Sequence, residues 1–129
     1  MPTRSFSSAP NCVRLAPRAK RLDDADLAAA CSMAAFTASL HAGQGCALTT
    51  RLVVPRVHYS AAVEAAAATM GAIKPGDPAA KRTVCGPVIS ERQRDRVLSY
   101  LDLANREGGK FACGGGLPAD QPKGFFVEP

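Results

Sequence analysis

Small and apolar residues recur at helical spacing in three stretches of the chain. The first is expected to begin at Asp23 or Asp24, either of which can cap a helix, and to stop at Gly43. Its apolar positions are Leu27, Cys31, Ala34 and Ala38. The second stretch covers residues 60–73, is rich in alanine, and is closed by a Pro-Gly-Asp-Pro turn at 75–78. The pattern therefore predicts two small-sided helices that neighbouring elements can approach closely.

A third helix is predicted after Ser90. The sequence Ser90-Glu91-Arg92-Gln93 has the form of a capping box, in which Ser and Gln each bond a free backbone N–H. An apolar stripe of Val97, Leu101 and Ala104 follows, with charged residues beside it. Gly108 and Gly109 are expected to end this helix.

Short apolar runs at residues 51–55, 110–113 and 125–128 favour strands over helices. Glycine- and proline-rich sequence joins the last two runs. The order of elements becomes helix, strand, helix, helix, strand, strand. This order indicates an α/β fold, in which helices cover short and largely parallel strands.

Charge is divided unevenly along the 129 residues, whose net charge is +5. Five of the sixteen basic residues lie within the first 22 positions, where no acid occurs; the remaining eleven are balanced by eleven acids. A nucleic-acid-binding surface is normally basic across a folded face and interleaved with aromatics, which are only 5 % here. The sequence therefore predicts no nucleic-acid partner, and the lack of a long apolar run predicts no membrane span.

Five widely spaced cysteines without a CxxC pair argue against a disulfide framework and against a zinc site, so no metal is expected. A reducing, cytoplasmic setting is the simplest interpretation. Residues 1–22 have no helical or strand periodicity and are interpreted as a separate basic arm. Their serines and arginines resemble a transit peptide, although three prolines disfavour the helix that such a peptide forms.

The sharpest local feature is Gly43-Gln44-Gly45-Cys46. A thiol in a glycine-flanked bend can face free backbone N–H groups, which stabilise a thiolate and an oxyanion formed beside it. From the spacing alone, Cys46 is either such a nucleophile or a small buried hydrophobe. His41 is either its partner in a Cys–His pair or a residue with a local polar role.

Taken in order, several segments resemble the catalytic domain of the NAD(P)-dependent aldehyde dehydrogenase superfamily. The resemblance spans about 108 residues, and each motif would be weak alone. The matching motifs are Leu22-Asp23-Asp24-Ala25-Asp26-Leu27, Gly43-Gln44-Gly45-Cys46 with Arg51 beyond it, Gly76-Asp77-Pro78, Gly86-Pro87-Val88-Ile89-Ser90, Gly114-Gly115-Gly116 and Gly124-Phe125-Phe126-Val127-Glu128-Pro129. The resemblance implies that residues 23–129 form a partial aldehyde dehydrogenase catalytic domain.

The resemblance also implies roles for individual residues. Cys46 occupies the position of the catalytic nucleophile, which attacks the aldehyde carbon to give a thiohemiacetal. In the family, hydride then passes to NAD or NADP, and water cleaves the resulting thioester. Gln93 and Arg96 align with cofactor-binding positions that contact a ribose in some members, where the second residue is usually Lys. Gln93 is explained equally well by the capping box.

Departures from the family are as informative. The general-base glutamate should fall near residues 11–13, but residues 1–22 contain no acid. The cofactor-binding domain is missing, as is the segment that follows Pro129 in the family. We therefore expect a fragment of an oxidoreductase that binds no cofactor and is not a competent dehydrogenase alone.

Two other functions remain open. The chain could be a non-enzymatic remnant or a module that docks onto an intact homologue, and exposed sheet edges would promote self-association. Alternatively, the basic arm could carry the function, by targeting or by binding an anionic surface.

Overall fold

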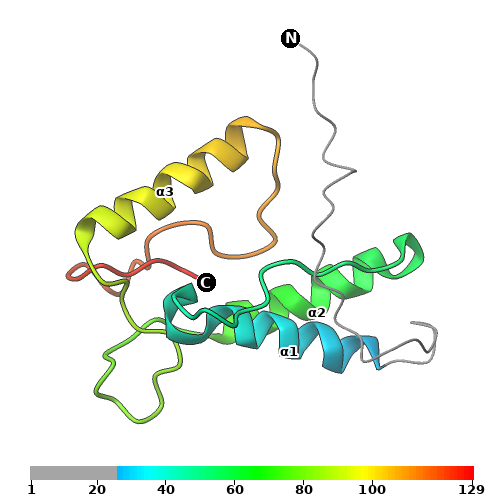
Figure 1. Cartoon of the computed structure of the whole chain (residues 1–129), viewed down its shortest axis with the longest axis horizontal. Helices are drawn as coiled ribbons and strands as arrows, with labels where there is room; N and C mark the ends of the chain where they lie inside the picture. Colours follow the sequence, from blue (N-terminus) through cyan, green and yellow to red (C-terminus); the bar gives the residue numbers. More distant parts are fainter. Residues whose placement is uncertain (1–25) are drawn as a thin grey trace.

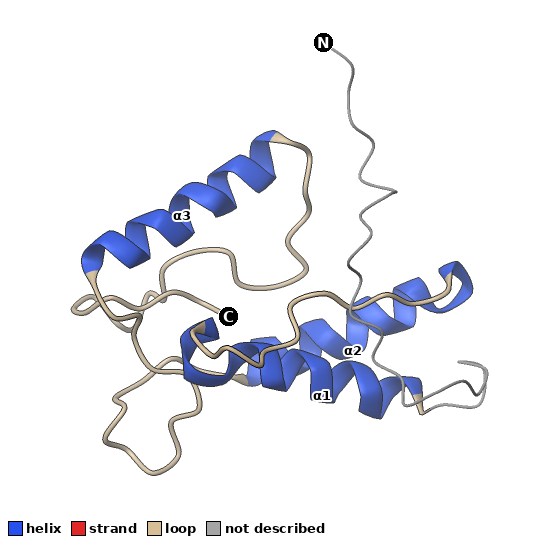
Figure 2. Ribbon diagram, viewed as in Figure 1, coloured by secondary structure: helices blue, strands red, loops and turns tan. Residues whose placement is uncertain are grey.

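The computed structural model describes residues 26–129, and three α-helices dominate this part of the chain (Figure 1, Figure 2). They are α1 (Leu27–Ser39), α2 (Tyr59–Ala72) and α3 (Glu91–Arg106). Two short 3-10 helices, η2 (Leu40–Gly43) and η3 (Arg56–His58), lie at the end of α1 and the start of α2. All three predicted helices are thus confirmed in type.

Helix α1 begins later than expected. Its cap is Asp26, whose Oδ1 accepts a hydrogen bond from the N–H of Ala29 at 3.0 Å. The two acids favoured as caps, Asp23 and Asp24, lie outside the described residues. The α-helix ends at Ser39, and the chain turns through η2 to Gly43, which has a φ of +73°. Gly43 therefore ends the helical segment, as its conformational freedom suggests.

Helices α1 and α2 lie side by side and pack against each other (Figure 1). The buried positions of this pair are Cys31, Ala34, Ala35, Ser39 and Ala62, all of them small. Small side chains let two helix backbones approach closely, but they remove little apolar area from water. The helix pair is consequently close-packed around a thin core.

Helix α3 is held differently. Ser90 caps it, because its Oγ accepts from the Gln93 N–H at 3.3 Å, as the capping box predicted. None of its sixteen residues is buried, although its apolar residues gather on one side. Figure 2 shows α3 apart from the α1–α2 pair, with which it makes no helix–helix contact. Its position therefore depends on the segments that flank it.

The strand predictions were wrong within the described residues, which contain no β-strand. Residues 51–55, 110–113 and 125–128 run as loops and bends. The only bridge recorded in residues 26–129 is an isolated parallel one between Pro75 and Cys85. A β-branched run becomes a strand only when a neighbour satisfies its backbone groups in a ladder. Residues 125–128 instead make isolated backbone hydrogen bonds, to Val88 and to Gly116.

The C-terminal segment lies between α3 and the α1–α2 pair (Figure 1). The N–H of Val88 donates to the carbonyl of Phe125 at 2.9 Å, and the N–H of Glu128 donates to that of Gly116 at 3.0 Å. Cys85, Val88 and Phe126 are buried. No helix in the described residues is long and apolar enough to cross a membrane.

Candidate active site

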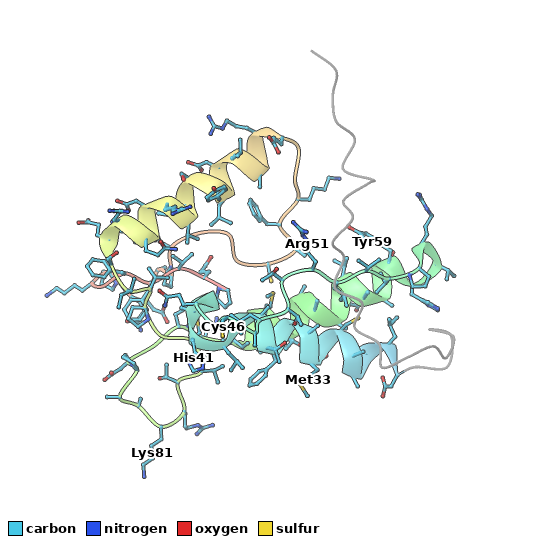
Figure 3. All side chains as sticks on the ribbon, viewed as in Figure 1. Met33, His41, Cys46, Arg51, Tyr59 and Lys81 are labelled. Atoms are coloured by element: carbon cyan, nitrogen blue, oxygen red, sulfur yellow. The ribbon has the colours of Figure 1, made fainter. Side chains whose placement is uncertain are left out.

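The glycine-flanked cysteine lies directly after an unusual turn. His41 and Ala42 have φ values of +52° and +54°, and Gly43 continues the left-handed conformation at +73°. Non-glycine residues rarely adopt this region, and they persist there only where the surroundings hold them. The turn brings the chain out of η2, and Gln44 and Cys46 beyond it are exposed. Figure 3 labels His41 and Cys46 on this segment.

Cys46 is exposed and is a free thiol. The alternative that it is a small buried hydrophobe is therefore not supported by the fold. Neighbouring Gly45 is tightly placed, because a Cβ there would lie 3.0 Å from the Leu48 side chain. A side chain at position 45 would oblige Leu48 to move by a few tenths of an ångström, so glycine suits this position by its small size and not by its dihedral angles.

The other described cysteines differ from Cys46 in their surroundings. Cys31 and Cys85 are buried, and burial raises the pKa of both thiols. The backbone N–H of Ala42 opposes this shift at Cys85, whose Sγ also donates weakly to the Gly86 carbonyl at 3.8 Å. Because a thiolate is the reactive form, these two thiols are poor nucleophiles. Cys113 is half-buried.

Cys113 lines an apolar cavity of about 320 Å³ between α2 and the C-terminal segment. Its lining includes Val63 and Met70 of α2, Leu101 of α3, and Phe111. Cys46 does not line this cavity. Cys46, the cysteine chosen from the sequence, and this apolar cavity are thus separate features.

A Cys–His pair is not formed. His41 is exposed, and no hydrogen bond joins its side chain to Cys46 in the described part of the chain. Its carbonyl oxygen instead accepts from the backbone N–H of Gln44 at 3.1 Å. Residues 26–129 also hold no group of three His, Cys, Asp or Glu side chains that could bind a metal ion.

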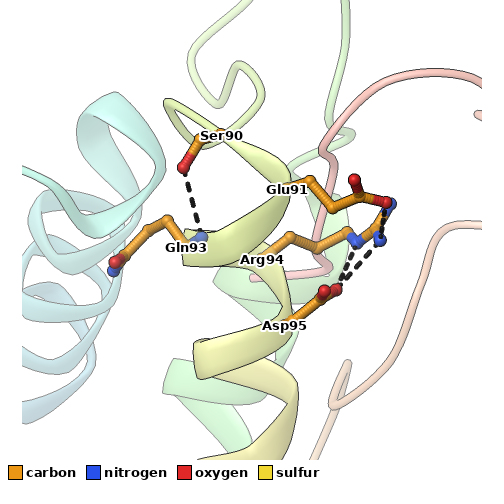
Figure 4. Close-up of polar contacts among 5 residues, drawn as sticks. All are labelled: Ser90, Glu91, Gln93, Arg94 and Asp95. Atoms are coloured by element: carbon orange, nitrogen blue, oxygen red, sulfur yellow. Dashed lines mark hydrogen bonds and ion pairs between the residues drawn. The ribbon is translucent and has the colours of Figure 1, made fainter.

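Gln93 and Arg96 lie three residues apart on α3, so they share one face of the helix. The Gln93 side chain points away from the neighbouring charged cluster of Glu91, Arg94 and Asp95 (Figure 4). No hydrogen bond within residues 26–129 engages its amide group, so only the serine half of the capping box is formed. Arg96 is exposed.

Arg94 is the basic residue of α3 whose side chain forms ion pairs with two carboxylates. Its guanidinium pairs with Asp95 at 2.9 Å and with Glu91 at 3.0 Å (Figure 4). The hydrogen bond to Asp95 is the main cause of a raised pKa for Arg94. Its guanidinium carbon also lies 5.9 Å from the centre of the Phe125 ring. The sequence pattern showed only charged residues beside the apolar stripe of this helix and did not predict the contact with the C-terminal segment.

The sequence matches the pattern of the aldehyde dehydrogenase family over residues 21–129. The chain belongs to that family. Betaine aldehyde dehydrogenase of Brucella ovis is 41 % identical to it over 109 residues, which are 83 % of this chain and 22 % of that protein. The chain thus spans about a fifth of the length of the curated relatives it matches.

Solved aldehyde dehydrogenases share the fold. A cysteine-to-alanine variant of aldehyde dehydrogenase C from Pseudomonas syringae, in complex with NAD+ and octanal, superposes with a TM-score of 0.79 at 37 % identity. An aldehyde dehydrogenase of Mycobacterium tuberculosis with NAD+ gives a TM-score of 0.78 at 42 % identity. Each alignment covers 84 % of this chain and 22 % of the other. The α/β class expected from the sequence is therefore that of its structural relatives.

Proposed function

We propose that this chain is a piece of an aldehyde dehydrogenase in which Cys46 is the catalytic nucleophile. The observation that carries the proposal is an exposed free thiol directly after a left-handed glycine turn, within a sequence that matches the family. Two similar structures also involve a cysteine: one carries a cysteine-to-alanine change, and a betaine aldehyde dehydrogenase of Staphylococcus aureus carries a BME-modified cysteine.

The chemistry open to Cys46 is addition to a carbonyl carbon. A carbon–sulfur bond forms, and the carbonyl π electrons move onto oxygen, where nearby backbone N–H groups can stabilise the negative charge. The substrate of the intact protein is then a small aldehyde, which becomes an acid. The octanal complex of the Pseudomonas relative supports this class.

NAD or NADP would be the hydride acceptor when bound by the intact protein. In this chain, the Gln93 amide and the Arg96 guanidinium offer hydrogen-bond donors on one face of α3, which suits the hydroxyls of a ribose. Two donors on one exposed face do not hold a dinucleotide alone. We therefore propose that the chain by itself binds no cofactor and completes no dehydrogenation.

The nucleophile can be tested without a cofactor. Attack of the Cys46 thiolate on p-nitrophenyl acetate releases p-nitrophenolate and leaves an acetyl thioester, which peptide mapping by mass spectrometry locates. We expect the acetyl group on Cys46 in the full chain, and its loss in Cys46→Ala. Cys113→Ala is the matched control, since Cys113 is the other cysteine of residues 26–129 that is not buried.

The same variants should be compared for aldehyde-dependent NADH formation. Ester hydrolysis and NADH formation that are present in the full chain and unchanged in Cys46→Ala would show that the nucleophile is another residue. Ester hydrolysis that is lost in Cys113→Ala instead would move the assignment to that thiol.

A second candidate function is docking onto an intact homologue. Exposed sheet edges were the expected route, but the described residues contain no sheet. Exposed apolar side chains provide a different one: Val57 and Ile89 are each 82 % exposed, and Tyr100 on α3 is 60 % exposed. Sedimentation of the chain with and without an intact relative distinguishes docking from a lone monomer.

The proposal also includes the domain division and the location. We assign residues 1–22 to an arm and 23–129 to a partial catalytic domain, supported by a family match that begins at residue 21. The arm lies outside the described residues. A cytoplasmic location is supported by the four free thiols among residues 26–129.

A further inference from the structure

Gln44 makes two side-chain hydrogen bonds that point in different directions. Its Oε1 accepts from the backbone N–H of Ile89 at 3.1 Å, and its Nε2 donates to the carbonyl of His41 at 3.2 Å. The first bond joins residues 45 positions apart in the chain. Both the donor and the acceptor of one amide group are therefore used, one within the turn and one outside it.

The bond within the turn stabilises a strained conformation. The His41 carbonyl receives both the side-chain and the backbone N–H of Gln44, and His41 itself has a φ of +52°. Two donors on one oxygen hold that carbonyl in place, so the left-handed turn before Cys46 is fixed from its C-terminal side.

The bond outside the turn reaches the start of α3. Ile89 directly precedes Ser90, which caps the helix and bonds the Gln93 N–H. Helix α3 does not pack directly on α1 or α2; Leu101 faces α2 only across the apolar cavity. The hydrogen bond between Gln44 and Ile89 therefore contributes to the placement of the left-handed turn relative to α3, beside the contact of the Ala42 N–H with the Cys85 thiol.

We propose that Gln44 is a positioning residue, which fixes the Cys46 turn against the first residues of α3. The importance of this positioning for catalysis rests on the proposed function, in which Cys46 and Gln93 belong to one site. Gln44 touches neither the reacting thiol nor a substrate. It acts through the His41 carbonyl and the Ile89 N–H.

The test uses the full chain with two substitutions of equal size. Gln44→Met keeps the length of the side chain and removes both hydrogen bonds, whereas Gln44→Glu keeps an acceptor for Ile89. Gln121→Met is the matched control, in a loop distant in sequence from the turn. Hydrogen exchange of the Ile89 amide should quicken about tenfold in Gln44→Met, remain slow in Gln44→Glu, and be unchanged in Gln121→Met.

A distance measurement tests the positioning directly. Nitroxide labels on Cys46 and on Arg92→Cys, in a Cys12→Ser and Cys113→Ser background, report the separation of turn and helix; Cys31 and Cys85 are buried. We expect a narrow distance distribution that broadens in Gln44→Met and narrows again in Gln44→Glu. Circular dichroism of each variant confirms that the helices remain.

Equal exchange at Ile89 and equal distance distributions in Gln44→Met and Gln121→Met would overturn the proposal. The outcome of these two measurements does not depend on whether Cys46 is the nucleophile. If the acetyl group is not on Cys46, but the distribution still broadens in Gln44→Met, Gln44 positions the turn and the nucleophile lies elsewhere.

Discussion

The hydroxyl groups of Thr37 and Thr49 lie 3.0 Å apart, which links α1 to the segment that follows Cys46. The single hydroxyl hydrogen of Thr37 is directed at the carbonyls of Met33 and Ala34, at 2.9 and 3.0 Å. Its oxygen is consequently the acceptor, and Thr49 is the donor. The cysteine segment is thus held on both sides, by Gln44 before Cys46 and by Thr49 after it.

Replacing Thr49 by Val removes this hydrogen bond and keeps the shape of the side chain. We expect a loss of about 0.5–1.5 kcal/mol in the free energy of unfolding, because Thr37 keeps its carbonyl partners and no other group is stranded. Chemical denaturation followed by circular dichroism measures the loss. Thr50→Val, at an exposed neighbour, is the control; equal effects of both changes would contradict the link.

The α1–α2 interface should not accept a larger side chain. Ala62 is 3 % exposed on a helix that packs against α1, whose buried residues are Cys31, Ala34, Ala35 and Ser39. We expect Ala62→Leu to destabilise the chain by about 1–3 kcal/mol, because a close-packed pair must separate to admit it. Ala61→Leu, one residue earlier and exposed, should change the midpoint of thermal unfolding little. A larger loss in Ala61→Leu would mean that α2 packs on its other side.

Helix α3 should depend strongly on its cap. Ser90→Ala removes the acceptor for the Gln93 N–H and should cost about 1 kcal/mol. Because α3 has no buried residue to compensate, part of its helicity should be lost, which amide exchange along residues 91–95 reports. Ser99→Ala, in the exposed middle of the same helix, should leave that exchange unchanged.

Stability should fall in alkaline solution. Burial raises the pKa of Cys31 and Cys85 above the ordinary 9.0, so the folded chain keeps protons that the unfolded chain has lost. The contribution of these thiols is therefore full below about pH 9 and declines as pH rises through the folded pKa. Cys31→Ala should show a shallower decline than the unsubstituted chain in thermal melts from about pH 8 to about pH 10.5. Cys113→Ala should retain the steeper decline in stability of the unsubstituted chain.

Arg94 should hold the C-terminal segment near α3. Its guanidinium faces the Phe125 ring while two carboxylates orient it. In Arg94→Gln we expect the Val88 N–H, which bonds the Phe125 carbonyl, to exchange about two- to threefold faster. Arg92→Gln changes an exposed arginine of the same helix and serves as the control. Added salt should reduce the difference, since the ion pairs are partly exposed.

The helices could be predicted from the sequence because their signals are local. Alanine content, the stripe from Val97 to Ala104 and the Ser90 cap each act within a few residues. The start of α1 was misplaced by two or three positions. Asp23, Asp24 and Asp26 are chemically alike, so the sequence alone does not say which one caps.

The remaining features depend on partners that are distant in the chain. Residues 51–55 have strand-like composition, but a strand needs a neighbour to complete its ladder. The Gln44–Ile89 hydrogen bond spans 45 positions, which no local pattern encodes. Cys46 was proposed because glycines flank it, whereas neither its exposure nor the left-handed turn at His41 and Ala42 was predicted by the local pattern.

The separation of α3 from the helix pair has a thermal consequence. Isolated polar contacts, such as the hydrogen bonds of Ile89 and Val88 and the Arg94–Phe125 contact, link α3 to its surroundings, while α1 and α2 are held by a continuous interface. On warming, the distance between the Cys46 thiol and Gln93 should become variable first, and the helices should unfold in a later step. Any reactivity that requires both Cys46 and Gln93 would then be lost well below the temperature at which the helices unfold.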